Sequence, residues 1–155
     1  MRTMSVITPD SPDMHSSQQE IVDEFGFFDD WTGRYQYLID LGRKLPPLAD
    51  EDRTDANKVD GCQSQVWMHA RVDDGRVLFE GDSDALLVRG LVALLLRVYS
   101  DATPEEILST PPDFVKEVGL ESKLSPSRAN GLFSMIKQMK YYAMAFQALE
   151  ASKGR

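Results

Sequence analysis

Cys62 is the only cysteine of this chain and therefore its one soft nucleophile. It lies within residues 57–67, directly after Gly61 and just before an apolar segment. A single thiol closes no internal disulfide, and it does not supply the three or four ligands of a structural zinc site or an iron–sulfur cluster. Two interpretations stay open on these residues alone: an inert, packed cysteine, or a thiol that is used for its chemistry.

A cysteine–histidine hydrolase would need His69, because His15 lies in an N-terminal segment without any periodicity. Seven residues of extended chain separate Cys62 from His69 and span about 23 Å. Their odd spacing also places the two side chains on opposite faces of a regular strand. The pattern argues against a hydrolytic pair and favours a solvated or half-buried strand histidine.

The acidic run 82–84 has the composition of a metal-binding loop, but its position before an apolar segment is typical of a helix start. Capping of that helix by Asp82 or Ser83 explains the run better. The sequence contains no Gly-rich phosphate loop, paired metal motif or Gly-x-Ser-x-Gly. We therefore expect no metal site and no cofactor held by this chain.

The formal net charge of −8 argues against nucleic acid and anionic membranes as partners, because both require a basic face. No run of residues approaches the ~18–20 apolar residues of a membrane-spanning helix, and the first residues lack an apolar signal core. We expect a cytoplasmic protein, where a lone thiol stays reduced. A monomer is the default expectation.

Residues 1–16 mix proline, serine, aspartate and threonine without periodicity, which predicts a disordered N-terminal tail. Residues 17–155 are expected to form a single domain, since 42% hydrophobic content is ample for one core. Gly90 interrupts a segment that is apolar nearly all round, which predicts a central helix with one close neighbour.

Capping residues, prolines and apolar spacing predict the helices. The expected helices run from Ser16 or Ser17 to about Gly26, from Asp29 or Asp30 to Pro46-Pro47, from Asp82 or Ser83 through Val98, from Thr103, from Thr110 to about Gly119, and from Ser125 toward the C-terminus. The last helix is expected to be the longest, and its methionines are expected to fill the core.

The periodicity changes from helical to alternating after Gln65, which predicts a strand over residues 66–72. Asp73-Asp74-Gly75 is a hairpin signal, and residues 76–80 form the returning strand. A third, shorter strand is expected near Val59, with Gly81 ending the sheet segment. The predicted fold class is α+β, with a small antiparallel sheet of about three strands packed against helices.

The alternation of side chains along this strand also predicts the direction in which the Cys62 thiol points. If the extended conformation reaches back far enough, Cys62, Ser64, Val66 and Met68 share one face, and the sulfur points toward the core. Burial in apolar surroundings raises a thiol pKa above its ordinary value of about 8.5 and suppresses the thiolate.

Residues 57–67 read Asn-Lys-Val-x-Gly-Cys-x-Ser-x-Val-Trp and resemble the signature of the SufE family, the sulfur acceptors of iron–sulfur cluster assembly. Further blocks match the same family in order. They are Leu41-Gly42, Leu45-Pro46, Gly81-Asp82-Ser83-Asp84-Ala85, Thr103-Pro104 and Leu124-Ser125-Pro126-Ser127-Arg128-x-x-Gly131-Leu132. The resemblance covers about residues 17–148 and implies a fold of the SufE/NifU-like type.

The resemblance implies a mechanism. A partner cysteine desulfurase of the SufS-like type, which carries pyridoxal phosphate, takes sulfur from L-cysteine and holds it as a persulfide. Cys62 accepts that sulfur, and the carrier stimulates the desulfurase. It then delivers the sulfur to a SufBCD-like scaffold complex that builds the cluster. Such an exchange requires a nucleophilic thiolate, access to the sulfur attacked and a good leaving thiolate.

Five further residues are implied as loop and support residues. Gly61, Ser64 and Trp67 belong to the signature itself. Asp84 either holds the loop or caps its helix, and Arg128 either lies near the loop or forms an ion pair at a helix start. We expect Cys62 to be sheltered in the free protein, and the loop 57–63 to swing outward on docking with Gly61 as its pivot.

Two alternatives to the sulfur carrier stay open at this stage. One is a NifU-like scaffold that assembles the cluster on itself, which would require several cysteine ligands where this chain has one. The other is a noncatalytic adaptor whose cysteine only fills the core. Thiol labelling distinguishes the adaptor from the carrier, and iron and sulfide analysis distinguishes the scaffold from both.

Overall fold

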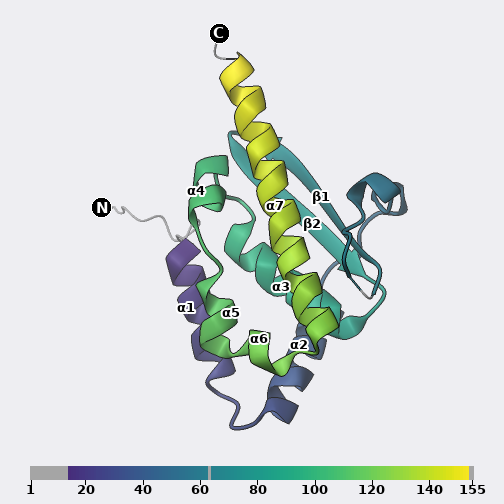
Figure 1. The fold of residues 1–155 in the computed structure, drawn as a ribbon, viewed down its shortest axis with the longest axis vertical. Helices are drawn as coiled ribbons and strands as arrows, with labels where there is room; N and C mark the ends of the chain where they lie inside the picture. The colour runs from purple at the N-terminus through teal and green to yellow at the C-terminus, as the bar shows by residue number, and fades with distance from the viewer. Residues whose placement is uncertain (1–13, 63, 154–155) are drawn as a thin grey trace.

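This computed structural model describes residues 14–62 and 64–153. A long C-terminal helix runs through the middle of the view in Figure 1, with a two-stranded hairpin on one side and the N-terminal helix and two short helices on the other. The elements, in chain order, are α1 Met14–Phe25, α2 Trp31–Lys44, the short 3-10 helices η1 Asp50–Asp52 and η2 Asp55–Asn57, β1 Val66–Asp73, β2 Arg76–Ser83, α3 Leu86–Tyr99, α4 Pro104–Ser109, α5 Asp113–Val118, α6 Leu120–Lys123 and α7 Pro126–Lys153. The α+β class is confirmed.

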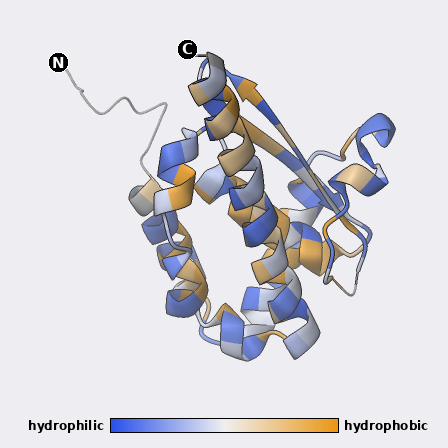
Figure 2. Ribbon diagram, turned by 45° about the horizontal axis from the view of Figure 1, so that its top comes forward, coloured by the Kyte–Doolittle hydropathy of each residue, from blue (hydrophilic) through white to orange (hydrophobic). Residues whose placement is uncertain are grey.

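The helix α3 lies at the centre, where it contacts α1, α2, α7 and β2. Its glycine permits the predicted close approach, because a Cβ on Gly90 would stand 2.0 Å from the backbone oxygen of Leu38 in α2. Hydrophobic residues gather where helices and hairpin meet, and polar residues cover the outer sides (Figure 2). Burial of these apolar surfaces is the main driving force for this arrangement.

The hairpin follows the predicted turn chemistry. Asp74 and Gly75 both have positive φ, 54° and 77°, as a two-residue turn of type I′ requires. The register runs from Asp73 opposite Arg76 to Val66 opposite Ser83. The prediction that Gly81 ends the sheet segment is wrong: Gly81 pairs with Met68 inside β2. A side chain would collide there, since a Cβ would lie 2.8 Å from Val92 Cγ1.

The sheet has two strands among the described residues, one fewer than predicted. The expected strand near Val59 is reduced to one bridge between Lys58 and Trp67, with Val59 N–H donating to the Val66 carbonyl at 2.8 Å. The 3-10 helix η2 ends at Asn57, and the chain turns at Gly61 with φ 85°. These two features leave no length for a strand between them.

Several helix starts match their predicted signals. Asp30 caps α2 by accepting from Gly33 N–H, and Thr103 forms a capping box with Glu106. Two expectations are wrong. The first helix begins at Met14 rather than after Ser16 or Ser17, and α3 has Ala85 at its N-cap position without a capping side chain. The predicted tail otherwise falls on residues 1–13, outside the described residues.

The long helix α7 packs against α3, α4 and both strands, and it passes in front of α3 in the view of Figure 1. It begins at Pro126 as predicted, and its buried stripe includes Leu132, Met135 and Met139. Within the described residues, none of the helices combines the length and the apolar character that crossing a membrane would require.

Candidate functional site

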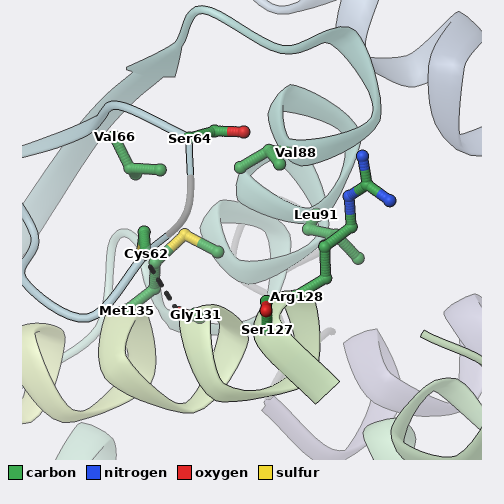
Figure 3. A pocket seen from close by; sticks show the side chains of 9 residues that line it. All are labelled: Cys62, Ser64, Val66, Val88, Leu91, Ser127, Arg128, Gly131 and Met135. Atoms are coloured by element: carbon green, nitrogen blue, oxygen red, sulfur yellow. Dashed lines mark hydrogen bonds between the residues drawn. The ribbon is translucent and has the colours of Figure 1, made fainter. Parts of the chain in front are cut away.

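Cys62 lies in the loop between the Lys58 bridge and β1, facing the first turns of α7. The thiol is partly buried, and its Sγ donates to the carbonyl oxygen of Gly131 at 3.7 Å (Figure 3). The prediction that Cys62 shares a strand face with Met68 assumed extended chain from Cys62 onward, but β1 begins only at Val66. The sulfur nevertheless turns inward, because the turn at Gly61 directs the loop toward α7.

A small pocket surrounds the sulfur, with a volume of about 10 Å³. Such a space holds roughly one water-sized atom. Its walls come from the loop, β1, α3 and α7: Cys62, Ser64, Val66, Val88, Leu91, Ser127, Arg128, Gly131 and Met135 (Figure 3). Aliphatic and methionine side chains form its inner side, so the thiol lies in an apolar environment with a polar rim.

Two glycines allow the loop to lie against α7. A Cβ on Gly131 would stand 3.3 Å from Cys62 Sγ, and a Cβ on Gly61 would stand 2.8 Å from the hydroxyl oxygen of Ser134. Gly61 also has a positive φ that L side chains disfavour. Sequence reasoning gave Gly131 no role, although a glycine inside a long predicted helix was a signal of close packing.

Burial raises the pKa of the Cys62 thiol, and the nearby negative charge of Asp60 raises this pKa further. Both effects disfavour the thiolate, in the direction that the sequence predicted. The free protein therefore holds its thiol mainly in the protonated form at neutral pH. A partner or a movement of the loop must supply the conditions for nucleophilic attack.

Asp84 holds the far end of the loop. Its Oδ1 accepts from Gln65 N–H at 3.1 Å, and its own N–H donates to the Gln65 carbonyl at 3.3 Å. Ser83 Oγ donates to the same carbonyl at 2.7 Å. Of the two roles considered for Asp84, the structure shows the loop-holding one, since Ala85 occupies the N-cap position of α3.

Asp82 is buried with 1% of its surface exposed, and it holds together segments that precede and follow the loop. It accepts from Arg53 at 2.5 Å and from Leu48 N–H at 2.9 Å, and it lies 3.3 Å from Arg89 Nε. Sequence reasoning assigned this carboxylate to helix capping, and that assignment is wrong. A carboxylate buried to this degree requires charged partners, and two arginines supply them.

Trp67 and Ser64 lie on different sides of the loop. Ser64 lines the pocket, whereas Trp67 stacks against the Arg53 guanidinium, whose carbon lies 5.4 Å from the ring centroid. Trp67 thus contacts Arg53, which binds Asp82, and it also forms the bridge with Lys58 at the start of the cysteine loop. Trp67 therefore supports the loop rather than touching the sulfur.

Arg128 is exposed at the rim of the pocket, where its side chain extends from α7 past Leu91 (Figure 3). Within the described part of the chain it makes no ion pair, so the helix-start pair considered for it is not found there. Arg128 also borders an open depression of about 400 Å³ next to Tyr35 and Leu124. A cation is thus available to a molecule that approaches the cysteine pocket.

His69 does not line the cysteine pocket. It lies on β1 between Glu80 of β2 and Asp52 of η1, with its Nδ1 3.5 Å from Glu80 Oε1. The structure thus agrees with the sequence argument against a cysteine–histidine pair.

The family model described as "SufE: Fe-S metabolism associated domain" matches residues 19–143. The chain belongs to the SufE family. Membership implies a role in iron–sulfur metabolism. The matched range contains Cys62 and the other residues of the SufE signature, together with all the pocket-lining residues.

SufE-like relatives match most of the chain. An uncharacterized SufE-like protein of Synechocystis is 42% identical over 151 residues, which cover 95% of each chain. Another uncharacterized SufE-like protein, from Rhizobium etli, is 47% identical and covers 81% of this chain and 88% of its own. SufE-like protein 1, chloroplastic/mitochondrial, of Arabidopsis thaliana is 44% identical over 127 residues, 81% of this chain and 34% of that protein.

A solution structure supports the fold assignment. It is that of a hypothetical protein from Thermus thermophilus, with a TM-score of 0.69 over 83% of this chain and 94% of that chain. At 24% identity, this likeness concerns the fold alone.

Proposed function

We propose that this SufE-family chain accepts sulfur from the persulfide of a partner cysteine desulfurase onto Cys62, stimulates that enzyme, and delivers the sulfur to an iron–sulfur scaffold complex. The observation that carries the proposal is the placement of the chain's only thiol in an apolar pocket with room for about one more atom. A persulfide adds one sulfur atom to the cysteine, so the pocket suits both the empty and the loaded carrier.

The transfer is a thiol–persulfide exchange at Cys62. The thiol first loses its proton, and the Cys62 thiolate attacks the outer sulfur of the donor persulfide. A new S–S bond forms at Cys62 while the S–S bond of the donor breaks, and the donor cysteine leaves as a thiolate. The two sulfurs exchange roles without any net oxidation. Pyridoxal phosphate belongs to the partner enzyme, and this chain's own part needs no cofactor.

Shelter and reactivity conflict in the free protein, because burial and Asp60 raise the pKa of the Cys62 thiol. We infer that docking draws the loop away from Gly131, and so exposes the sulfur to water and to the donor. The fixed points are the Val59–Val66 hydrogen bond on one side and the Asp84–Gln65 hydrogen bond on the other. Cys62 lies between these two anchors.

Arg128 supplies a positive charge at the rim through which the donor must approach. A guanidinium attracts the thiolates that enter and leave during the exchange and does not itself titrate. Two substitutions distinguish the charge of Arg128 from its packing. Arg128→Lys should retain a higher rate of sulfur transfer than Arg128→Gln, while the two variants keep similar melting temperatures.

Mass spectrometry of the protein mixed with a cysteine desulfurase and L-cysteine tests the proposal. Wild type is expected to gain the mass of one or more sulfur atoms at Cys62, and a reducing agent should remove it. Cys62→Ser is expected to gain none and to keep its circular dichroism spectrum, because the hydroxyl is nearly isosteric with the thiol. Full stimulation of the desulfurase by Cys62→Ser would instead support a purely allosteric adaptor.

The scaffold alternative makes a different prediction. A scaffold would retain iron and sulfide after reconstitution, whereas the proposed carrier retains sulfur but no iron. Three or four protein ligands are the usual requirement for a cluster, and one cysteine does not meet it. We place the carrier in the cytoplasm, where its lone thiol stays reduced between transfers, and where the pocket shelters the persulfide from other thiols.

A further inference from the structure

A second group of polar side chains lies on the hairpin, separate from the residues that line the cysteine pocket. His69 of β1 stands directly opposite Glu80 of β2 in the strand register. His69 Nδ1 lies 3.5 Å from Glu80 Oε1, and its Nε2 lies 3.8 Å from Asp52 Oδ1 in η1. The imidazole ring is therefore flanked by two carboxylates from different segments.

The spacing of these three side chains suits a shared ion. One ligand atom from each of Asp52, His69 and Glu80 lies within 4.8 Å of the others. In a tetrahedral zinc site with bonds of about 2.0–2.2 Å, two ligand atoms stand about 3.3–3.6 Å apart. The side chains of Asp52 and Glu80 are 29% and 56% exposed, so neither carboxylate is fully enclosed by packed neighbours.

One nitrogen of the His69 imidazole lacks a hydrogen-bond partner among the described residues. This nitrogen, Nδ1, is buried. Buried polar atoms in proteins are almost always paired, and leaving one unpaired is destabilising. Glu80 lies close to His69 Nδ1, but the contact between them lacks hydrogen-bond geometry. This unpartnered nitrogen is an observation separate from the carboxylate spacing, and it lies on the side of the ring that faces Glu80.

The donor set selects a class of ion. Two anionic oxygens favour a divalent cation, and the two acids that precede Asp52 in η1 add to the negative field. Arg53, the adjacent cation, is engaged with Asp82 instead. Imidazole suits zinc, nickel and copper, whereas magnesium and calcium prefer sets made of oxygen alone. We propose that Asp52, His69 and Glu80 bind a zinc-like divalent ion, with one imidazole nitrogen, two carboxylate oxygens and water as ligands.

Such an ion would join η1 to the hairpin. The chain continues from η1 through Arg53 and η2 to the Lys58–Trp67 bridge, where the cysteine loop begins. An ion that binds only the folded chain raises the melting temperature by mass action. The ligands come from positions 52, 69 and 80, so no short sequence motif identifies the site. The proposal does not depend on sulfur transfer by Cys62.

Zinc titration by calorimetry tests the site, with Cys62→Ser as the parent protein so that the thiol cannot bind the metal. We expect one zinc ion per chain at neutral pH and a rise in melting temperature on saturation. Adding His69→Gln should weaken zinc binding at least about tenfold and remove the rise in melting temperature. Glu80→Gln repeats the test at a second ligand, and circular dichroism checks that each variant is folded.

Two control variants in the same parent isolate the site. His15→Gln removes the other imidazole of the chain, and Asp74→Asn removes a carboxylate at the hairpin turn; both should bind zinc as the parent does. Magnesium should not displace the zinc. The proposal is overturned if the parent binds no zinc, or if folded His69→Gln and Glu80→Gln bind it as tightly as the parent.

Discussion

The backbone oxygen of Gly131 accepts a hydrogen bond from Cys62 Sγ at 3.7 Å, and a Cβ on Gly131 would stand only 3.3 Å from the same sulfur. The loop and the long helix are thus in contact where the helix lacks a side chain. The relation between these two residues, 69 positions apart, determines how deeply the thiol lies.

Gly131→Ala should expose the thiol. The added methyl would crowd the sulfur and push the loop outward, so the rate of alkylation of Cys62 by a neutral reagent should rise several-fold. Alanine favours a helix interior over glycine by about 0.5–1 kcal/mol, so the melting temperature should not fall. Asn130→Ala, at an exposed neighbouring position, is the control and should leave the alkylation rate unchanged. An unchanged rate in Gly131→Ala would show that the pocket absorbs the methyl without moving the cysteine.

Gly61→Ala should disturb the loop more than a matched change at Gly75. Both glycines have a positive φ, 85° and 77°, so alanine costs about 1–2 kcal/mol of backbone strain at either. Only at Gly61 would the new Cβ also collide, at 2.8 Å from Ser134 Oγ, because Gly75 has open space around it. Chemical denaturation should show destabilisation in both variants, with slowed sulfur transfer in Gly61→Ala alone. Equal transfer rates in the two variants would exclude the contact with α7 as a determinant.

Asp84→Ala should loosen the far anchor of the loop. It removes the acceptor of the Gln65 N–H hydrogen bond, which costs about 0.5–1.5 kcal/mol of stability. The alkylation rate of Cys62 should rise because the loop leaves the pocket more often. Asp73→Ala, at the opposite end of the hairpin, is the control. If Asp84→Ala lowers the melting temperature without changing the alkylation rate, the anchor is structural only.

The pH profile of alkylation should show the raised pKa of the thiol. Because burial and the charge of Asp60 both favour the neutral thiol, the midpoint for the folded protein should lie above that of the urea-unfolded chain. Asp60→Asn should lower the midpoint without abolishing the difference, since burial is the larger cause. The sheltered thiol stabilises the fold below its unfolded-state pKa, and this contribution is lost as pH rises through the raised folded-state pKa. A midpoint that Asp60→Asn raises would contradict this account.

The sequence by itself determined the features that depend on neighbouring residues. Asp30 and Thr103 cap their helices, and Asp74-Gly75 forms the hairpin turn, because these signals act within a few residues of backbone. The signature around Cys62 and its accompanying blocks likewise identified the family. A lone thiol is visible in composition alone.

Only the tertiary structure decided which partner each polar side chain takes. Asp82 and Asp84 satisfy the local rule for helix caps, yet they bind Arg53 and Gln65, because long-range partners offer charge and buried hydrogen bonds that a cap does not. His69 faces Glu80 through the register that the predicted hairpin turn sets. The contact between Cys62 and Gly131, and that between His69 and Asp52, arise from the packing of separate segments. Sequence spacing carries no information on such distances until burial of the apolar faces around α3 brings the segments together.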